Sequence, residues 1–109
     1  MINKKSINKV ILIGHTGNLP DVRYTKEGLI VVSFSLATHE IQKEKEHTEW
    51  HNIVAWGSLG SFVEEHVKKG QLVCVEGRLK TRKWESKEGT LLSKTEILAS
   101  SIVPLEWKK

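Results

Sequence analysis

Hydrophobic and polar residues alternate most regularly between positions 29 and 38 of the chain. The apolar residues take the even positions, which hold Ile30, Val32, Phe34 and Leu36. Serine stands between them at positions 33 and 35. Because successive side chains of a strand point to opposite faces, this period of two predicts a strand with one buried face.

A strand is also expected near the start of the chain. Residues 6–14 are mostly β-branched or apolar, and the turn-forming residues 17–21 follow them. Residues 41–48 are dominated by Gln, Lys, Glu and His without periodicity, which indicates a solvated hairpin loop. We expect a third strand to follow this loop at residues 49–56.

One short helix is expected after the third strand. Residues 61–64 read Ser-Phe-Val-Glu, which has the form of a capping box at a helix start. One helical face would carry the apolar residues Leu59, Phe62, Val63 and Val67. Lys68, Lys69 and Gly70 supply the last-turn cations and the glycine that are typical of a helix end.

Two long strands complete the pattern. The fourth strand is expected at residues 71–84, and the fifth lies within residues 91–103, after a polar turn and before Pro104. Five strands with one short helix between strands 3 and 4 match the OB-fold, an all-β Greek-key barrel that binds oligonucleotides and oligosaccharides. An α+β sandwich is the alternative architecture.

The size and composition of the chain fit one folded domain over residues 1–109. Hydrophobic residues make up 39% and charged residues 28%, which argues against a disordered chain and against a membrane protein. Seventeen Lys and Arg residues against thirteen Asp and Glu residues give a formal charge of +4. This positive charge suits a polyanionic partner.

Cysteine content and the start of the chain indicate a cytoplasmic protein. The single Cys74 lies in an apolar run and has no second cysteine to pair with, so a buried thiol in a reducing compartment is expected. The apolar stretch at residues 10–13 is too short for a signal peptide. No apolar run of the sequence reaches the length of a membrane span.

Basic residues and a tryptophan share one face of the expected fourth strand. Four residues of equal parity project together from this face, namely Arg78, Lys80, Arg82 and Trp84. The opposite face carries the residues Val73, Val75, Gly77 and Leu79. Proteins hold single strands with basic grooves that follow the phosphates and with aromatic rings that stack on bases, at roughly 1–3 kcal/mol per base. The basic face is therefore a candidate nucleic-acid-binding surface.

Two further tryptophans, Trp50 and Trp56, share parity on the expected third strand. They are about 20 Å apart at the usual rise of a strand, far enough to stack on different bases. The alternative for each tryptophan is core packing, which is the stronger for Trp56 because it directly precedes Gly57 and the helix. Trp107 lies among the terminal residues, where packing or disorder is expected. For the basic residues, the alternative is a solvated strand face that prevents aggregation.

We expect no metal, no cofactor and no enzymatic activity. Five histidines occur, but none is spaced with Cys or with carboxylates as zinc ligands are. The chain also lacks a recognised Ser or Cys nucleophile motif and a phosphate-binding loop.

The sequence closely resembles the bacterial single-stranded-DNA-binding protein family. The similarity extends from residue 7 to about residue 103, and its longest block reads Glu-Gly-Arg-Leu-Lys-Thr-Arg-Lys-Trp. The matching blocks, in order, are residues 8–14, 20–24, 48–51, 69–70, 76–84 and 95–97.

This resemblance implies an OB-fold, usually a homotetramer, that wraps single-stranded DNA during DNA replication, recombination and repair, without catalysis or cofactor. Such a protein acts in the cytoplasm, at the nucleoid. The resemblance assigns base stacking to Trp50, Trp56 and Trp84, and the family often has Phe at the second of these positions. It assigns phosphate contacts to the basic residues Lys9, Arg23, Lys69, Lys80, Arg82 and Lys83.

Three departures from the family pattern change what is expected. Gln42 stands where the family has a tryptophan just after the second strand, so one stacking ring is absent. The loop at residues 41–48 is shorter than in typical members. The glycine-rich linker and the acidic C-terminal tip, which in the family recruits replication and repair proteins, are missing, as expected of a trimmed chain or of a tail-less member.

The alternative function is that of a primosome-type accessory protein, which uses the same barrel mainly for protein–protein contacts. The missing tip and Gln42 favour this alternative. Trp50, Trp84 and the basic face of the fourth strand favour DNA binding, because a protein-docking surface would gain little from them. An enzyme is the third and weakest alternative.

Overall fold

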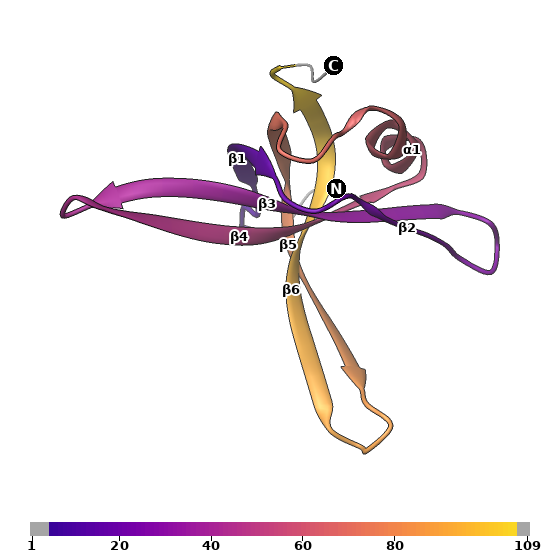
Figure 1. Cartoon of the computed structure of the whole chain (residues 1–109). Helices are drawn as coiled ribbons and strands as arrows, with labels where there is room; N and C mark the ends of the chain where they lie inside the picture. The colour runs from indigo at the N-terminus through magenta and orange to yellow at the C-terminus, as the bar shows by residue number, and fades with distance from the viewer. Residues whose placement is uncertain (1–4, 107–109) are drawn as a thin grey trace.

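Six strands and one helix make up the computed structural model, which describes residues 5–106 (Figure 1). In chain order the elements are β1 (Val10–Thr16), β2 (Asp21–Tyr24), β3 (Ile30–Gln42), β4 (Lys45–Trp56), α1 (Gly57–His66), β5 (Leu72–Glu85) and β6 (Leu91–Pro104). The strands form one sheet in the order β1, β5, β6, β4, β3, β2, and a pairing of β1 with β3 closes this sheet into a barrel. The predicted all-β barrel with one short helix is confirmed.

The predicted first strand, residues 6–14, corresponds to β1 (Val10–Thr16), and a second short strand, β2, follows it. β1 and then β2 pair antiparallel with the same strand, β3. Between them, the N–H of Gly17 donates to the carbonyl of Ser35 on β3, which keeps the chain alongside that strand. The two segments together take the place of one barrel strand. β2 was not predicted because Pro20 and Asp21 are typical of turns and the strand has only four residues.

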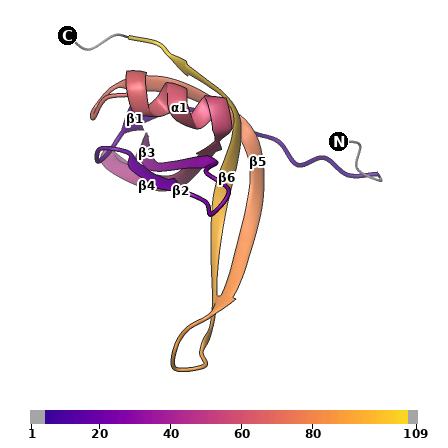
Figure 2. The same ribbon diagram turned by 90° about the vertical axis from the view of Figure 1, so that its right-hand side faces the viewer.

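The hydrophobic core lies inside the barrel and under α1. Val63 of the helix is fully buried, and Leu59 and Phe62 pack against the core, which confirms the predicted apolar face of the helix. Figure 2 shows α1 lying across the barrel on the side of β3 and β4. The buried residues of the core cluster are Ile30, Val32, Phe34, Leu36, Ile53, Ala55, Val63, Val67, Val73, Val75, Ile97 and Ile102.

The helix begins and ends earlier than predicted. Its N-cap is Trp56, the last residue of β4, because the chain passes from strand into helix at Gly57 without a loop. Ser61 consequently lies inside the helix, and the predicted capping box is wrong. The helix ends at His66, so the predicted last-turn cations at positions 68 and 69 instead belong to the turn that leads into β5.

Residues 41–48 form a β-hairpin and not the predicted loop. β3 continues to Gln42, β4 begins at Lys45, and the two residues between them have left-handed backbone angles (φ 53° and 64°), as in type I′ hairpin turns. Both faces of this hairpin are exposed to solvent. No alternation of apolar residues is therefore required there, which is why the sequence pattern did not reveal the strands. Gln42, where the resemblance placed the absent tryptophan, pairs with Lys45 beside the turn.

β5 and β6 form a long two-stranded ribbon that extends beyond the barrel (Figure 2). Ser100 of β6 is an extra residue opposite the step from Glu76 to Gly77, and its hydroxyl donates to the Glu76 carbonyl at 3.2 Å. Such a bulge bends a strand and increases its twist. Beyond the bulge, residues 78–85 of β5 are exposed. The ribbon thus leaves the core at the bulge and projects its side chains into solvent.

Candidate nucleic-acid interface

The outer face of β3 and β4 carries two of the predicted stacking residues. Ile53 and Ala55 of β4 are fully buried inside the barrel. Trp50 and Trp56 have the opposite parity on this strand and project outward, with exposed fractions of 59% and 45%. The alternative that these tryptophans pack in the core is therefore wrong.

Each of these tryptophans lies at one end of a row of three residues across the sheet. Trp56 pairs with Val31 of β3, and Val31 pairs with Arg23 of β2. The second row joins Trp50 to His15 of β1 through the intervening residue of β3. Directly opposed residues share a face of the sheet. In both rows, a basic side chain lies on the same face of the sheet as the tryptophan, two strands away. This side chain is Arg23 in the row of Trp56 and His15 in the row of Trp50.

Gly17 lies under the Trp50 ring. A Cβ atom at position 17 would lie 2.8 Å from Cζ3 of Trp50 and would also meet the Ser35 hydroxyl. Carbon atoms in favourable contact are about 3.5–4.0 Å apart. The absence of a side chain at Gly17 is therefore what allows the ring to lie this close to the backbone between β1 and β2.

The third predicted stacking residue, Trp84, lies on the ribbon. Its exposed fraction is 39%, and the Arg82 guanidinium carbon lies 4.7 Å from the centroid of its ring. A cation at this distance is attracted to the face of the ring. Arg82 also binds the Glu96 carboxylate with two nitrogens, both at 3.3 Å. These two contacts hold the guanidinium on the same side of the ribbon as Trp84.

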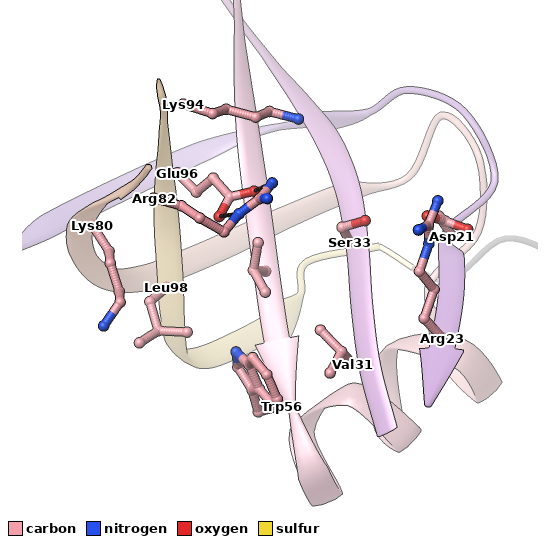
Figure 3. A pocket seen from close by; sticks show the side chains of 11 residues that line it. Asp21, Arg23, Val31, Ser33, Trp56, Lys80, Arg82, Lys94, Glu96 and Leu98 are labelled. Atoms are coloured by element: carbon pink, nitrogen blue, oxygen red, sulfur yellow. Dashed lines mark hydrogen bonds and ion pairs between the residues drawn. The ribbon is translucent and has the colours of Figure 1, made fainter. Parts of the chain in front are cut away.

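A cavity of about 630 Å³ separates this side of the ribbon from the outer face of the sheet. Figure 3 shows Lys80, Arg82 and Lys94 on the ribbon, with Trp56 and Arg23 on the sheet. The full lining is Asp21, Arg23, Val31, Ser33, Val54, Trp56, Lys80, Arg82, Lys94, Glu96 and Leu98. Four cations against two carboxylates give this cavity a net positive charge.

Two ion pairs hold the carboxylates of the cavity. Asp21 accepts from Nε of Arg23 at 3.0 Å, and both side chains are more than half exposed. Such an exposed pair contributes little to stability, so the guanidinium is available to a phosphate at little cost. Glu96 is more enclosed than Arg82, with exposed fractions of 15% and 54%. Its carboxylate orients the guanidinium and neutralises part of its charge.

Lys94 was not predicted from the sequence. It pairs with Arg82 across the ribbon, so the two residues share the face that lines the cavity. The turn at residues 86–90 joins β5 to β6, and pairing the two strands outward from this turn would have placed Lys94 opposite Arg82.

The other predicted basic residues lie elsewhere. Lys83 has the opposite parity to Arg82 and pairs with Ser93, so it projects from the far face of the ribbon. Lys69 is exposed in the turn after α1 and is not among the residues that line this cavity. The structure thus brings Arg23, Lys80 and Arg82 together and leaves Lys69 and Lys83 apart from them.

Lys9 and Arg78 line a second cavity, of about 330 Å³, with Glu76 and Ser100 at the bulge. The side chain of Asn8 accepts from the N–H of Leu79 and donates to its carbonyl, both at 2.9 Å. These side-chain hydrogen bonds lie two positions beyond the last β1–β5 pair, Val10 with Gly77, and hold the segment that contains Lys9 beside β5. Leu98 lines both cavities. They therefore adjoin each other across β6.

Among residues 5–106, no group of three or more His, Cys, Asp and Glu side chains could hold a metal ion. In the same range, no helix is long and apolar enough to cross a membrane. Trp107, the fourth tryptophan of the sequence, lies outside the described residues.

Residues 7–105 match the model of the single-strand binding protein family. The chain is 46% identical to single-stranded DNA-binding protein 1 of Chlorobaculum tepidum, over 90% of this chain and 64% of that protein. It is 42% identical to single-stranded DNA-binding protein 1 of Xylella fastidiosa, over 95% of this chain and 81% of that protein. The chain thus spans about two thirds to four fifths of the length of these relatives.

A solved structure with the same fold contains nucleic acid. It is the Plasmodium falciparum SSB complex with ssDNA, which superimposes with a TM-score of 0.85 at 35% sequence identity and covers 96% of this chain and 100% of that one. Since the family model covers nearly all of the residues that the structure describes, this chain belongs to the single-strand binding protein family.

Proposed function

We propose that this protein binds single-stranded DNA without sequence preference, by stacking bases on tryptophans and by contacting phosphates with Lys and Arg. The observation that carries the proposal is the cavity between the sheet and the ribbon, where the exposed Trp56 ring lies among four cations. The names of the relatives support it, as does the ssDNA held by the structural neighbour.

The exposure of the rings favours an unpaired strand over a duplex. A base can lie flat on an indole ring only when that face of the base is not already stacked in a double helix. Trp50 and Trp56 present their rings on one sheet face, and Trp84 presents a third on the ribbon. The cations between sheet and ribbon then neutralise the backbone that connects the stacked bases.

The wider role that we propose is protection of single strands in DNA replication, recombination and repair, by a cytoplasmic homotetramer formed from one domain per chain. Exposed apolar side chains outside the interface support assembly. Ile13 of β1 and Val103 of β6 both pair with Cys74 of β5, and they are 57% and 50% exposed. Ile11 is 56% exposed on the same face. Burial of such a face between copies would be favourable.

Titration with a dT oligomer tests the binding itself. We expect the oligomer to quench tryptophan fluorescence, with an affinity that falls as salt is added, because each phosphate contact releases counterions. Four cations in the cavity predict a slope of about −3 for the logarithm of the binding constant against the logarithm of the salt concentration. A duplex of the same length should compete poorly.

Two lysine variants give this test its control. Lys80→Ala removes a cation that lines the cavity and should flatten the slope by about 0.7. Lys26→Ala removes an exposed lysine from the turn between β2 and β3 and should leave the slope unchanged. Equal affinity for duplex, or no quenching at low salt, would favour the accessory protein-docking alternative.

Gly17→Ala tests the contribution of the Trp50 platform. The new methyl group would displace the Trp50 ring, and binding should lose part of the roughly 1–3 kcal/mol that a stacked base contributes. Both groups that the methyl meets are side chains that can rotate, so the free energy of unfolding should fall by no more than about 1 kcal/mol.

Affinity for the dT oligomer and urea denaturation measure the two effects of Gly17→Ala. Ser35→Ala is the matched control, because it removes the hydroxyl at the same place without moving the ring. Unchanged affinity in Gly17→Ala would show that the position of the Trp50 ring does not matter for binding.

A further inference from the structure

Two histidines lie on the same sheet face as Trp50. Ala37 of β3 pairs with Trp50 on one side and with His15 of β1 on the other, so these three residues form one row. His39, two positions after Ala37 on β3, projects from the same face. Its ring centroid lies 6.3 Å from that of His15, at an interplanar angle of 49°. The two imidazoles therefore flank the Trp50 end of the interface.

Both histidine side chains reach solvent. His15 is exposed, and the side chain of His39 is 41% exposed. Nδ1 of His39 is 3.0 Å from the Thr48 hydroxyl and 3.5 Å from the Glu46 carboxylate. Both contacts involve Nδ1, and neither involves the second ring nitrogen, Nε2. The Thr48 contact thus fixes the orientation of a ring whose second nitrogen points away from the contact.

Two carboxylates belong to the segments that adjoin this pair. On β4, Glu46 has a charge opposite to that of a protonated His39. On β5, Leu72 pairs with His15, and the N–H of Leu72 donates to the Glu106 carboxylate at 3.3 Å. Neither β1 nor β3 adds a lysine or arginine to this face at the row of Trp50.

The two rows of the interface differ in the cation that they contain. Arg23, in the row of Trp56, is charged at every pH of interest. The row of Trp50 has His15 in the equivalent place, and imidazole is the side chain whose charge ordinarily changes between pH 5 and pH 8. A phosphate that follows a base stacked on Trp50 would meet a full positive charge only after protonation.

We propose that protonated His15 and His39 bind a backbone phosphate of the single strand beside the base held by Trp50, an assignment that rests on the proposed DNA-binding function. The pair forms a phosphate subsite additional to the cavity between sheet and ribbon. The strand is then held at the Trp56 end at any pH and at the Trp50 end more tightly in mild acid.

The test is the salt dependence of dT-oligomer binding at about pH 8 and at about pH 5.5, the range in which imidazole titrates. Thymine has no group that titrates in this range. One phosphate contact to a single strand contributes about 0.7 to the slope. For the unmodified chain, the slope should be steeper by about that amount at the lower pH, with about fivefold to tenfold tighter binding at low salt.

Three variants separate this subsite from other titrating groups. His15→Gln combined with His39→Gln should give the same slope at both values of pH. His15→Lys, whose charge is permanent, should give the steeper slope at both. His47→Gln is the matched control, because His47 is on the same hairpin but has the opposite parity to Thr48, and it should behave as the unmodified chain.

Each outcome has a separate meaning. A slope that does not change with pH in the unmodified chain, or one that changes equally in the double His→Gln variant, would overturn the histidine assignment and leave DNA binding intact. Failure to bind the dT oligomer at either pH would instead overturn the proposed function. Urea denaturation of each variant confirms that the chain remains folded at both values of pH.

Discussion

Replacement of Trp50 and Trp84 by alanine in the same chain is expected to weaken dT-oligomer binding by about 2–6 kcal/mol, the sum of roughly 1–3 kcal/mol for each stacked base. The two effects should add, because the rings lie on different elements, one on β4 and one on the ribbon, and would hold different bases. Fluorescence titration of the two single variants and of the double variant measures this additivity, with Trp56 and Trp107 as the remaining tryptophans.

Folding is the control for this experiment. Both rings are substantially exposed, so the free energy of unfolding should fall by no more than about 1 kcal/mol, which includes the cation–π contact of Arg82 with Trp84. The matched variant Trp50→Phe with Trp84→Phe keeps an aromatic face at each position and should retain most of the affinity. A large loss of stability in the alanine variant, or full affinity without either ring, would contradict stacking.

Gly77→Ala is expected to lower the free energy of unfolding by about 1–3 kcal/mol, the usual cost of an added methyl group in a packed site. A Cβ atom at this position would meet the backbone of β6, namely the carbonyl oxygen of Leu98, its carbonyl carbon at 2.9 Å and Cα of Ala99 at 3.0 Å. Backbone atoms cannot rotate away as side chains can. The two strands would have to separate at the bulge, and urea denaturation measures the cost.

The ribbon would also change position relative to the sheet in Gly77→Ala. Lys80 and Arg82 follow the bulge and line the cavity, so the affinity for single-stranded DNA should fall together with the stability. Ser100→Ala is the matched control. It deletes the exposed hydroxyl that donates to Glu76 in the same bulge but adds no contact with Gly77. Unchanged stability in Gly77→Ala would show that β6 shifts freely at this point.

Much of the barrel could be predicted from the sequence because its core strands are buried on one face. The alternation from Ile30 to Leu36 reports that burial directly, and the four apolar residues at its even positions all belong to the core. The same local rule placed Trp50 and Trp56 together on one face of β4. The alternation of side chains between the two faces of a strand depends only on the geometry of that strand. It is therefore the same however the strands are arranged in space.

Elements without a buried face were missed. The β3–β4 hairpin beyond Thr38 is paired but solvated on both sides, so its composition is that of a loop. β2 has four residues, of which only Val22 is partly buried against the core, and turn-forming residues precede it. Backbone hydrogen bonds do not depend on side-chain type. A sequence pattern therefore has no signal for strands that are formed in this way.

By itself, the sequence determined the faces of the core strands, the presence of one helix and the residue types that we propose for base stacking and phosphate contacts. Only the tertiary structure decided which of these residues share a site. The parallel pairing of β4 with β6, together with the bulge at Gly77, sets the ribbon opposite the sheet. Because of this arrangement, Lys94 and Trp56 line the same cavity, while Lys83 projects from the far side of the ribbon. Which side chains share a face is a property of one strand. Whether the ribbon lies opposite the sheet depends instead on contacts between residues that are far apart in the chain.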